Sequence, residues 1–317
     1  MNTYENQQSK ELRAGMGEGL VEAGKANPDV VALSADVKGS VKMDGFAKEF
    51  PERFIQCGIA EANMTGIAAG LSLCGKIPFI GGFAEFVTGR IYDQIRQVVA
   101  YSNKNVKICG SHAGISLGED GATHQTMEDI GLMKALPNMT VLVPCDFNQA
   151  KQATLAAAKH NGPVYLRLGR SKMPNFTPAD EPFEIGKAQM MTEGRDVTIF
   201  ACGHLVWEAL EAAKALDAEG IKAEVINIHT IKPLDKDAII ASTKKTGAVV
   251  TCEEHLINNG LGDSVAQVLA MNLPTPMEYV AVDDKFGESG TPDEMLTNYG
   301  LRAKDIVEKV HKVLKRK

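Results

Sequence analysis

No uninterrupted apolar run in this 317-residue sequence approaches the roughly 18 residues that a membrane-spanning helix needs. The N-terminal segment MNTYENQQSKELRAG also lacks the apolar stretch of a secretory leader. We therefore expect no membrane partner, no secretory leader and a cytoplasmic location. The formal net charge of −6 argues further against nucleic acid or an anionic membrane surface as the main partner.

Metal-binding signatures are missing as well. The six cysteines include no CxxC pair and are scattered along the chain, which is typical of buried thiols in a reducing compartment. His112 and His124 have neither HxxxH nor HExxH spacing, and no cysteine or acid completes a recognisable metal shell. We therefore predict no metal ligands in this chain.

Two nucleotide-binding motifs are also absent. The sequence has no GxGxxG after a strand and no GxxxxGKS or GxxxxGKT. These absences disfavour a dinucleotide-binding enzyme and a P-loop protein, respectively. A GxSxG match is present, as GISLG at 114–118 within SHAGISLGEDGATHQ.

What the sequence does contain is an alternation of short apolar, β-branched runs with segments of helical spacing. This pattern predicts an α/β fold whose first sheet is parallel and buried on both faces. The predicted strands of that sheet lie within residues 30–36, 53–58, 77–83, 106–112, 139–146 and 163–170.

A proline-rich segment without periodicity, 171–187, divides the chain. A second α/β alternation follows it and ends in the amphipathic segment AKDIVEKVHKVLKRK. The chain length itself suggests about two domains. We predict a first domain at 1–174, a linker at 175–187 and a smaller second domain at 188–317.

Polar or aromatic residues follow five of the predicted strands. In parallel α/β sheets, ligands sit at the carboxyl ends of the strands, so these segments are the candidate site. The alternative is that each residue only caps a helix or stabilises a turn, which is common for one segment and less so for all five. The segments are SADVKGS, GIAEAN, GGFAEF, SHAGISLGEDGATHQ and LGRSKMP.

Glu61 precedes an Ala- and Gly-rich, nearly uncharged helical segment, ANMTGIAAGLSLCG, which we expect to be buried. Two explanations remain open. As an acid in the first turn, Glu61 would stabilise the helix by several tenths of a kcal/mol. As a carboxyl group in an apolar environment, it would keep a proton and share it with a heterocycle. Phe83 and Phe86 have the spacing of core residues, although the adjacent Gly-Gly permits close approach of a flat ring.

The remaining candidates are polar. His112 and His124 could donate hydrogen bonds to a substrate or act as general acids and bases. Asp120 would accept from a hydroxyl group, and Arg13 and Arg170 could hold a phosphate or carboxylate, with solvated side chains as the common alternative. Three histidines near predicted strand ends of the second domain are more typical of surface or interface residues: His204, His229 and His255.

In order and spacing, these motifs resemble the C-terminal portion of transketolase, which consists of a pyrimidine-binding domain and a transketolase C-terminal domain. The most specific part is SHAGISLGEDGATHQ followed by a helix and LPNMTVLVPCD. SADVKGS, GIAEAN, GGFAEFVTGRIYDQI and FGESGTPDEMLTNYGL extend the resemblance over nearly the whole chain. The resemblance implies a thiamine-diphosphate-dependent transferase that moves a two-carbon ketol unit from a ketose phosphate to an aldose phosphate.

The resemblance also implies which residues bind the cofactor. Glu61 would bind the N1′ atom of the cofactor's aminopyrimidine and so promote loss of the thiazolium proton. Phe83 and Phe86 would form an aromatic wall against the pyrimidine. Asp36 would lie near the thiazolium end.

For the substrate, the resemblance implies that His112 and His124 contact the donor and acceptor sugars and take part in catalysis. Asp120 would read a substrate hydroxyl, so GEDGATHQ is expected to be a loop that reads sugar hydroxyls. The residues expected at the phosphate end are Arg13, Ser40 and Arg170.

Two departures from transketolase affect the interpretation. The family's diphosphate-binding domain, with its GDG motif and downstream asparagine, has no counterpart here, because GDS at 262–264 lies in the second domain without a partner motif. We therefore expect the smaller subunit of a split transketolase, which is inactive alone. It pairs with an N-terminal subunit, and that subunit provides most of the Mg²⁺ ligands. The expected assembly is an α2β2 heterotetramer. Gly89 stands where transketolases often have an aromatic residue, which is a departure within the expected pyrimidine pocket.

Three alternatives share the fold or the motifs. A 1-deoxy-D-xylulose-5-phosphate synthase has a similar DG.TH motif but normally no histidine at position 112. The beta subunit of a 2-oxo acid dehydrogenase is also split but lacks the GEDG.THQ loop. A non-catalytic regulatory subunit would not need the polar groups that this chain retains. The sugars, and whether they belong to the pentose phosphate route or to a specialised pathway, stay open.

Overall fold

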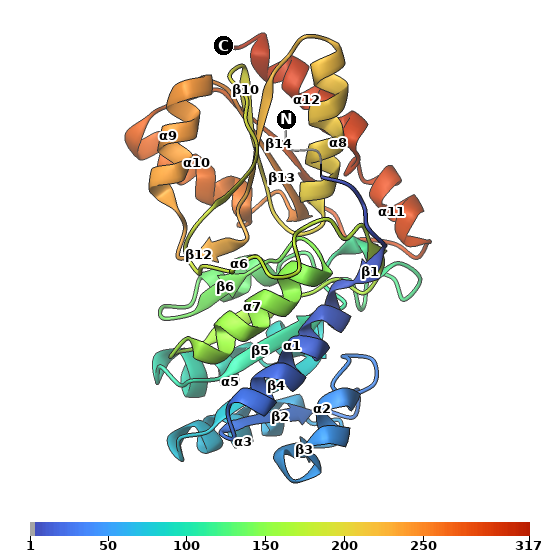
Figure 1. Ribbon diagram of the computed structural model, residues 1–317, viewed down its shortest axis with the longest axis vertical. Coiled ribbons are helices and arrows are strands. Elements are labelled where there is room, and N and C mark those ends of the chain that lie inside the picture. The colour runs from blue at the N-terminus through green and yellow to red at the C-terminus, as the bar shows by residue number, and fades with distance from the viewer. Residues whose placement is uncertain (1–3) are drawn as a thin grey trace.

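Residues 4–317 are described in a computed structural model, in which the chain forms two α/β units, each built around one sheet (Figure 1). The fold class predicted from the alternating pattern is confirmed. The first sheet has the strand order β12-β6-β7-β5-β4-β2-β3, and every neighbouring pair except β12–β6 is parallel. Its strands are β2 (Val30–Ser34), β3 (Phe54–Gln56), β4 (Ile77–Phe83), β5 (Lys107–Ser111), β6 (Thr140–Leu142), β7 (Val164–Arg167) and β12 (Thr230–Lys232).

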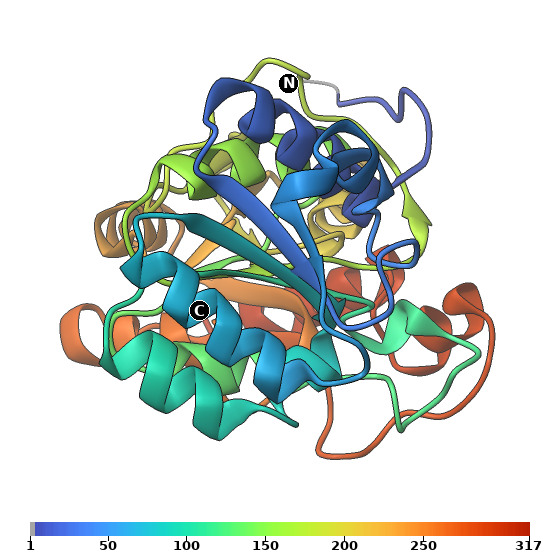
Figure 2. The same ribbon diagram turned by 90° about the horizontal axis from the view of Figure 1, so that it is seen from below.

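Helices cover both faces of this sheet, which explains why its strands are apolar throughout. Along β2, Val30 and Ala32 pack in the core under α1 and α7, whereas Val31 and Leu33 pack in the core under α3. Figure 2 shows these two helical layers on opposite sides of the sheet. The helical elements of the first unit are α1 (Leu12–Ala26), α2 (Asp44–Glu49), η1 (Pro51–Arg53), α3 (Glu61–Leu73), α4 (Ala84–Thr88), α5 (Tyr92–Gln94), η2 (Ile95–Tyr101), η3 (Ile115–Leu117), α6 (Asp129–Lys134) and α7 (Phe147–Lys159).

Two helical segments differ from what their residue spacing indicates. FVTGRIYDQIRQVVAYSN (86–103) has helical spacing but is not one helix, because α4 ends at Thr88 and the chain resumes as the short α5 and the π-helix η2. Glycine at position 89 disfavours a continuous helix there. The helix α3 is buried on only one face. Its other face carries small residues, and at its end Leu73 is 70% exposed.

The second unit has a five-stranded sheet in the order β14-β13-β10-β11-β9, in which only β9 is antiparallel to its neighbour. The last helix, α12, buries Ile306, Val310 and Val313 against this unit, as its amphipathic sequence indicates. The elements are β9 (Gln189–Thr192), β10 (Val197–Ala201), α8 (Leu205–Ala218), β11 (Ala223–Asn227), α9 (Lys236–Thr246), β13 (Val249–Leu256), α10 (Leu261–Asn272), β14 (Met277–Val282), α11 (Pro292–Asn298) and α12 (Ala303–Leu314).

The two units share chain segments. β12 comes from the predicted second domain but pairs with β6 at the edge of the first sheet. A two-stranded ribbon joins β1 (Lys10–Glu11) to β8 (Lys172–Met173). The segment between the units is irregular yet fixed, since Asp146 accepts hydrogen bonds from the backbone of Phe176 and Thr177 at 2.8 and 2.6 Å. The boundaries at residues 174 and 188 stay predictions.

The cysteines differ from expectation at two positions. All six are free thiols, and four are buried, but Cys57 is half-buried and Cys74, just after α3, is exposed. Cys74 is exposed because it follows the exposed end of α3. Among residues 4–317, no helix is both long and apolar enough to cross a membrane.

The close crossing of α1 and α7 predicts that alanine substitutions at two glycines change the stability of the protein differently. A Cβ atom at Gly15 would lie 2.1 Å from the Phe147 carbonyl oxygen, whereas one at Gly66 in α3 would meet no atom within 4 Å. Gly15→Ala should lower the free energy of unfolding by about 1–3 kcal/mol because the helices must separate. Gly66→Ala, the matched control, should raise it by up to about 1 kcal/mol. Urea unfolding midpoints measure both, and similar midpoints for the two variants would contradict this packing.

Candidate functional site

The carboxyl ends of β2, β3, β4, β5 and β7 meet at one edge of the first sheet. Residues predicted from separate sequence motifs come into contact there, because parallel strands deliver their following loops to the same edge. The Phe83 and His112 rings stack with centroids 3.9 Å apart, and the Phe86 and His124 rings meet edge to face at 5.2 Å. The backbone N–H of Asp36 donates to Gln56 Oε1 at 2.7 Å, which joins the first two strand ends.

His112 is the central buried residue of this edge. Its Nε2 lies 3.1 Å from Arg13 Nη1, and its Nδ1 lies 2.9 Å from Ser111 Oγ. Since a guanidinium can only donate, Nε2 accepts from Arg13, and the ring proton is on Nδ1 and points to Ser111. Burial, followed by the positive charges of Arg13 and Arg170, lowers the pKa of His112 to about 3. The imidazole is therefore neutral at physiological pH.

The backbone at His112 has φ +62°, and Asp36 has the same value. This left-handed conformation is uncommon outside glycine, although Asp and His adopt it more readily than most residues. His112 directly follows β5 and Asp36 is the second residue after β2, where the chain must turn sharply. Strained backbone of this kind often accompanies functional sites.

Phe83 and Phe86 form an aromatic wall rather than part of the closed core. Their rings are nearly parallel, with centroids 5.9 Å apart and planes 16° apart, and both side chains are half-buried. The wall is bordered by His112 on the Phe83 side and by His124 on the Phe86 side. It presents a flat apolar surface next to polar imidazoles.

Glu61 is the first residue of α3, and it is only 7% exposed. Its carboxylate pairs with Arg90, whose Nη1 lies 3.1 Å from Glu61 Oε1. The same guanidinium lies over the Phe86 ring, with Cζ 3.9 Å from the centroid. A planar group that donates N–H to Glu61 and stacks on Phe86 is thus accommodated here. Gly89 carries no side chain, and it is the following residue, Arg90, that covers Phe86.

Arg13 is already engaged by the protein. It donates to the Ser40 carbonyl at 2.7 Å and pairs with Glu11 at 3.0 Å, while its buried Nε has no partner among the described residues. Burial opposes ionisation of Glu11, but hydrogen bonds from Lys42 and Arg13 outweigh it and hold its pKa below the usual value. Ser40 itself is exposed, and it is its carbonyl group that contacts Arg13.

The GEDGATHQ loop lies next to Arg170. Arg170 Nη1 donates to the Leu117 carbonyl at 2.9 Å and to Glu119 at 2.7 Å. A hydrogen bond with its own backbone, followed by the Arg170 hydrogen bond, lowers the pKa of Glu119. Asp120 is exposed at the tip of the loop, and the imidazole Nδ1 of His124 lies 2.9 Å from Thr123 Oγ1.

Sequence reasoning missed three residues of this edge: Glu11, Gln56 and Arg90. Two of them had a signal in the sequence. Arg90 is four residues after Phe86, a spacing that places side chains on the same side of a helix. Gln56 ends a predicted strand beside the GIAEAN motif. Glu11 had none, because its partners Arg13 and Lys42 are brought together only by the fold.

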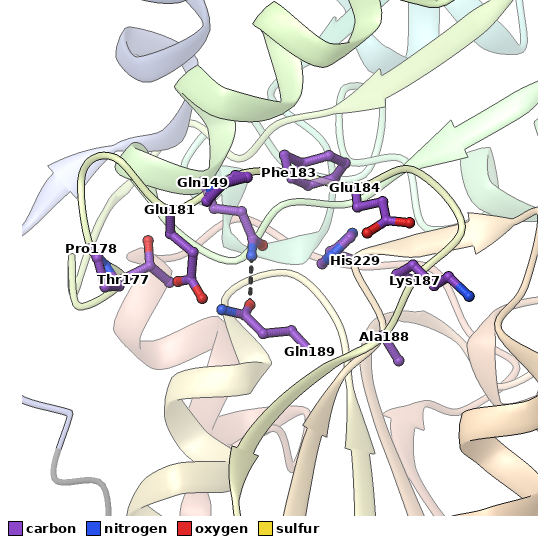
Figure 3. Close-up of a pocket in the computed structure, with 11 residues that line it drawn as sticks. Gln149, Thr177, Pro178, Glu181, Phe183, Glu184, Lys187, Ala188, Gln189 and His229 are labelled. Atoms are coloured by element: carbon purple, nitrogen blue, oxygen red, sulfur yellow. Dashed lines mark hydrogen bonds between the residues drawn. The ribbon is translucent and has the colours of Figure 1, made fainter.

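Two other features lie outside this edge. Within residues 4–317, no group of three or more His, Cys, Asp or Glu side chains is arranged to hold a metal ion. A cavity of about 180 Å³ lies where the segment 177–189 passes between the two units (Figure 3). His229 lines it, and burial lowers the pKa of this histidine to about 4. None of the predicted site residues lines this cavity.

The chain is similar to two family models that cover most of its length. The model described as "Transketolase, pyrimidine binding domain" matches residues 8–175. The model described as "Transketolase, C-terminal domain" matches residues 186–306.

Individual relatives match over nearly their whole length. The chain is 44% identical to the 6-deoxy-6-sulfo-D-fructose transketolase subunit SqwH of a Clostridium species, over 94% of this chain and 92% of that one. It is 38% identical to an apulose-4-phosphate transketolase subunit of Phocaeicola vulgatus, over 90% and 92%. A solved structure described as "Split gene transketolase, inactive beta4 tetramer" superposes with a TM-score of 0.91 at 48% identity, over 96% of this chain and 98% of that one.

The environment of His112 predicts an unusual titration. With a pKa of about 3, its ring should remain neutral and Nδ1-protonated from pH 8 down to pH 5. NMR spectra of protein labelled with ¹³C and ¹⁵N at histidine should then include an imidazole that keeps constant shifts over this range and disappears in His112→Gln; His229, with its pKa of about 4, should give a second nearly constant signal that remains in that variant. Free histidine in the same tube, with a pKa near 6.5, serves as the control. A transition of the assigned signal near pH 6.5 would contradict the derived hydrogen-bond arrangement.

Proposed function

This chain belongs to the transketolase family and corresponds to the C-terminal subunit of split transketolases, which are transferases; we propose that with a separate N-terminal subunit it forms a thiamine-diphosphate-dependent enzyme. The proposed reaction moves a two-carbon ketol unit from a ketose phosphate to an aldose phosphate. The observation that carries this proposal is the buried Glu61 carboxylate, which faces the aromatic wall across a planar, N–H-donating group.

The residues present fit the aminopyrimidine of the proposed cofactor. The Arg90 guanidinium is flat, donates to Glu61 and stacks on Phe86, and an aminopyrimidine needs the same two contacts. Arg90 is half exposed on the outer side of the site, so its side chain can withdraw toward solvent. When bound, the cofactor would supply a carbon nucleophile that accepts the two-carbon unit.

The chain's own residues would then act as follows. Glu61 would hold a proton against the pyrimidine nitrogen, with Phe83 and Phe86 as the wall that keeps the ring in plane and excludes water. His112 presents no ring N–H toward Arg13, so in the free subunit it can accept but not donate at Nε2. A substrate oxygen that displaces Arg13 would allow the other tautomer to form. His124 and Asp120 would meet the acceptor sugar at the loop, and Asp36 would lie near the thiazolium end.

The phosphate end of the substrates is assigned to Arg13, Ser40 and Arg170. Arg170 and Arg13 each hold a carboxylate of the chain, Glu119 and Glu11, respectively. A phosphate group would compete with these carboxylates for the guanidinium donors. Arg13 also offers its buried, unpartnered Nε among the described residues.

A separate N-terminal subunit would cover the exposed face of α3. Ile59, just before Glu61, is 78% exposed, and Tyr101 at the end of η2 is 82% exposed. α3 and η2 lie side by side on the outer face of the first unit (Figure 2). Several large apolar side chains exposed on one face are a feature of interaction surfaces. We propose that the N-terminal subunit docks here, supplies the Mg²⁺ and diphosphate ligands, and forms an α2β2 heterotetramer in the cytoplasm.

The sugars of the two named relatives differ from each other and from those of the pentose phosphate route. The class of substrate proposed here is therefore a ketose donor with an aldose acceptor, with xylulose 5-phosphate and ribose 5-phosphate as the reference pair. A specialised sugar pathway would use the same chemistry with a different pair.

Reconstitution tests this function directly. The chain is mixed with its candidate N-terminal subunit, thiamine diphosphate and Mg²⁺, and ketol transfer from xylulose 5-phosphate to ribose 5-phosphate is followed. A heptulose phosphate product is expected only from the pair, with neither subunit active alone. Turnover by this chain alone would refute the split architecture. Formation of deoxyxylulose phosphate from pyruvate would instead favour a deoxyxylulose-phosphate synthase.

Glu61→Gln separates the cofactor role of Glu61 from its helix role. The variant should unfold at nearly the same urea concentration as the parent chain, because a first-turn charge contributes at most about 1 kcal/mol. In the reconstituted pair, its turnover should fall by about 100-fold or more, since an amide cannot hold and return the proton. Near-normal turnover would leave Glu61 with the helix role alone.

Ile59→Asp should weaken assembly with the N-terminal subunit by about 10-fold or more, because it places a charge on the proposed apolar interface. Met271→Asp is the matched control, since Met271 is 79% exposed in the second unit. Sedimentation of each variant with the N-terminal subunit measures the effect. If both variants assemble like the parent chain, the α3 face is not the docking surface.

A further inference from the structure

We propose that the second unit of the chain positions the loop 115–125 through the buried carboxylate of Glu254, which makes Glu254 a positioning residue for substrate recognition. This inference rests on the proposed function, in which that loop reads the acceptor sugar. Glu254 lies near the carboxyl end of β13 in the second sheet, and it is only 4% exposed.

Both oxygens of this carboxylate are engaged. Oε1 accepts a hydrogen bond from the backbone N–H of Ser116 at 2.5 Å, and Oε2 lies 3.2 Å from His204 Nδ1. Ser116 belongs to η3, at the start of the loop. A buried carboxylate is stable only when such donors replace its lost water. The orientation of Glu254 is therefore tied to the position of the loop backbone.

The loop has the shape that this contact requires. Gly114 has φ +87°, and a Cβ atom there would lie 2.3 Å from Cδ of Glu254. Only glycine adopts this conformation readily and leaves room for the carboxylate. SHAGISL therefore has its glycine where the second unit reaches the first.

A second set of hydrogen bonds, made by Gln125, holds the other end of the loop. Gln125 is 4% exposed, and its Nε2 donates to the Ile115 carbonyl at 3.1 Å within the loop. The same amide donates to the Glu288 carbonyl in the second unit at 3.0 Å. Gly287 packs so closely on Gln125 that a Cβ atom there would lie 2.0 Å from Gln125 Oε1. The segments GEDGATHQ and FGESGTPDE are thus held together by one side chain.

The loop in turn sets the position of Arg170. The Leu117 carbonyl, one residue after Ser116, accepts from Arg170 at 2.9 Å, and the Ser116 carbonyl accepts from Ser171 Oγ at 2.8 Å. By contrast, His112 is held by Arg13 and Ser111 within the first unit. Loss of the Glu254 contact should therefore displace the loop 115–125 and Arg170, which would bind the hydroxyls and the phosphate of the acceptor. The position of His112 should not change.

The test compares two acceptors in the reconstituted pair, with hydroxypyruvate as the donor. Ribose 5-phosphate offers the hydroxyls and the phosphate that the loop and Arg170 would read, whereas glycolaldehyde offers neither. For Glu254→Ala, the ratio of kcat/KM for ribose 5-phosphate to that for glycolaldehyde should fall about 10-fold or more, through a raised KM. Glu254→Gln retains an oxygen acceptor for Ser116, and the ratio should stay within about 3-fold of the parent value.

A purely structural role would lower kcat/KM for both acceptors equally and leave the ratio unchanged, and that result would overturn the inference. Because Glu254→Ala could fail to fold, Gly287→Ala is the second variant, since it disturbs Gln125 from an exposed loop. It should lower the same ratio, with Lys285→Ala in the same loop as the control that leaves it unchanged.

Hydrogen exchange of the free chain tests the contact between Glu254 and the loop 115–125 without any measurement of turnover. Amides of 115–125 should exchange about 10-fold or more faster in Glu254→Ala, or in Gly287→Ala if the former does not fold, while those of 61–73 keep the parent rate. Unchanged exchange in 115–125 would overturn the inference. A parent pair inactive with both acceptors but showing this exchange pattern would refute the proposed function and leave the positioning contact standing.

Discussion

A single constraint, the parallel direction of β2 to β7, decides where everything else in the first unit lies. In a parallel sheet each connection must return over a face, so helices cover both faces and all carboxyl ends reach one edge. That edge brings together Asp36, Phe83 and His112 from three different strands. The left-handed backbone at Asp36 and His112 follows from the sharp turns needed there.

The junction between the two units has polar contacts beside an apolar core that both units share, and these polar contacts have an energetic consequence. Arg167 and Asp129 form a buried pair at 2.8 Å, and Tyr165 donates to the same carboxylate at 2.5 Å. Arg167 also donates to the Glu254 carbonyl at 2.8 Å. Buried pairs add little net stability because desolvation of both charges opposes their attraction, but they penalise any arrangement that separates them. Arg167, Asp129 and Tyr165 all belong to the first unit, so the bond from Arg167 to the Glu254 carbonyl is the one of these that crosses the junction. Moving the units apart would leave that buried donor without its acceptor, which favours one relative placement of the units and suits a loop that is held from both sides.

The fold and much of the edge were predictable from local patterns. Apolar runs such as 106–112 indicate strands whichever way they pair, and motifs such as GEDGATHQ keep their candidate residues within one loop. What local patterns could not predict is contact over long sequence separations. Arg90 pairs with Glu61 across 29 positions, and Ser116 meets Glu254 across 138. The exposed face of α3 was missed for a related reason, since an uncharged, Ala- and Gly-rich sequence suits a protein interface as well as a core.

By itself, the sequence determined the type and order of the elements, the strand-end positions of the candidate residues and the family resemblance, because each depends on residue type and short-range spacing. Only the tertiary structure decided the tautomer of His112, the planar Arg90 contact between Glu61 and Phe86, and the reach of Glu254 into the other unit. These features depend on where each side chain points and on how deeply it is buried. Both are set when sheets and helices pack against one another, so no single segment of the sequence encodes them.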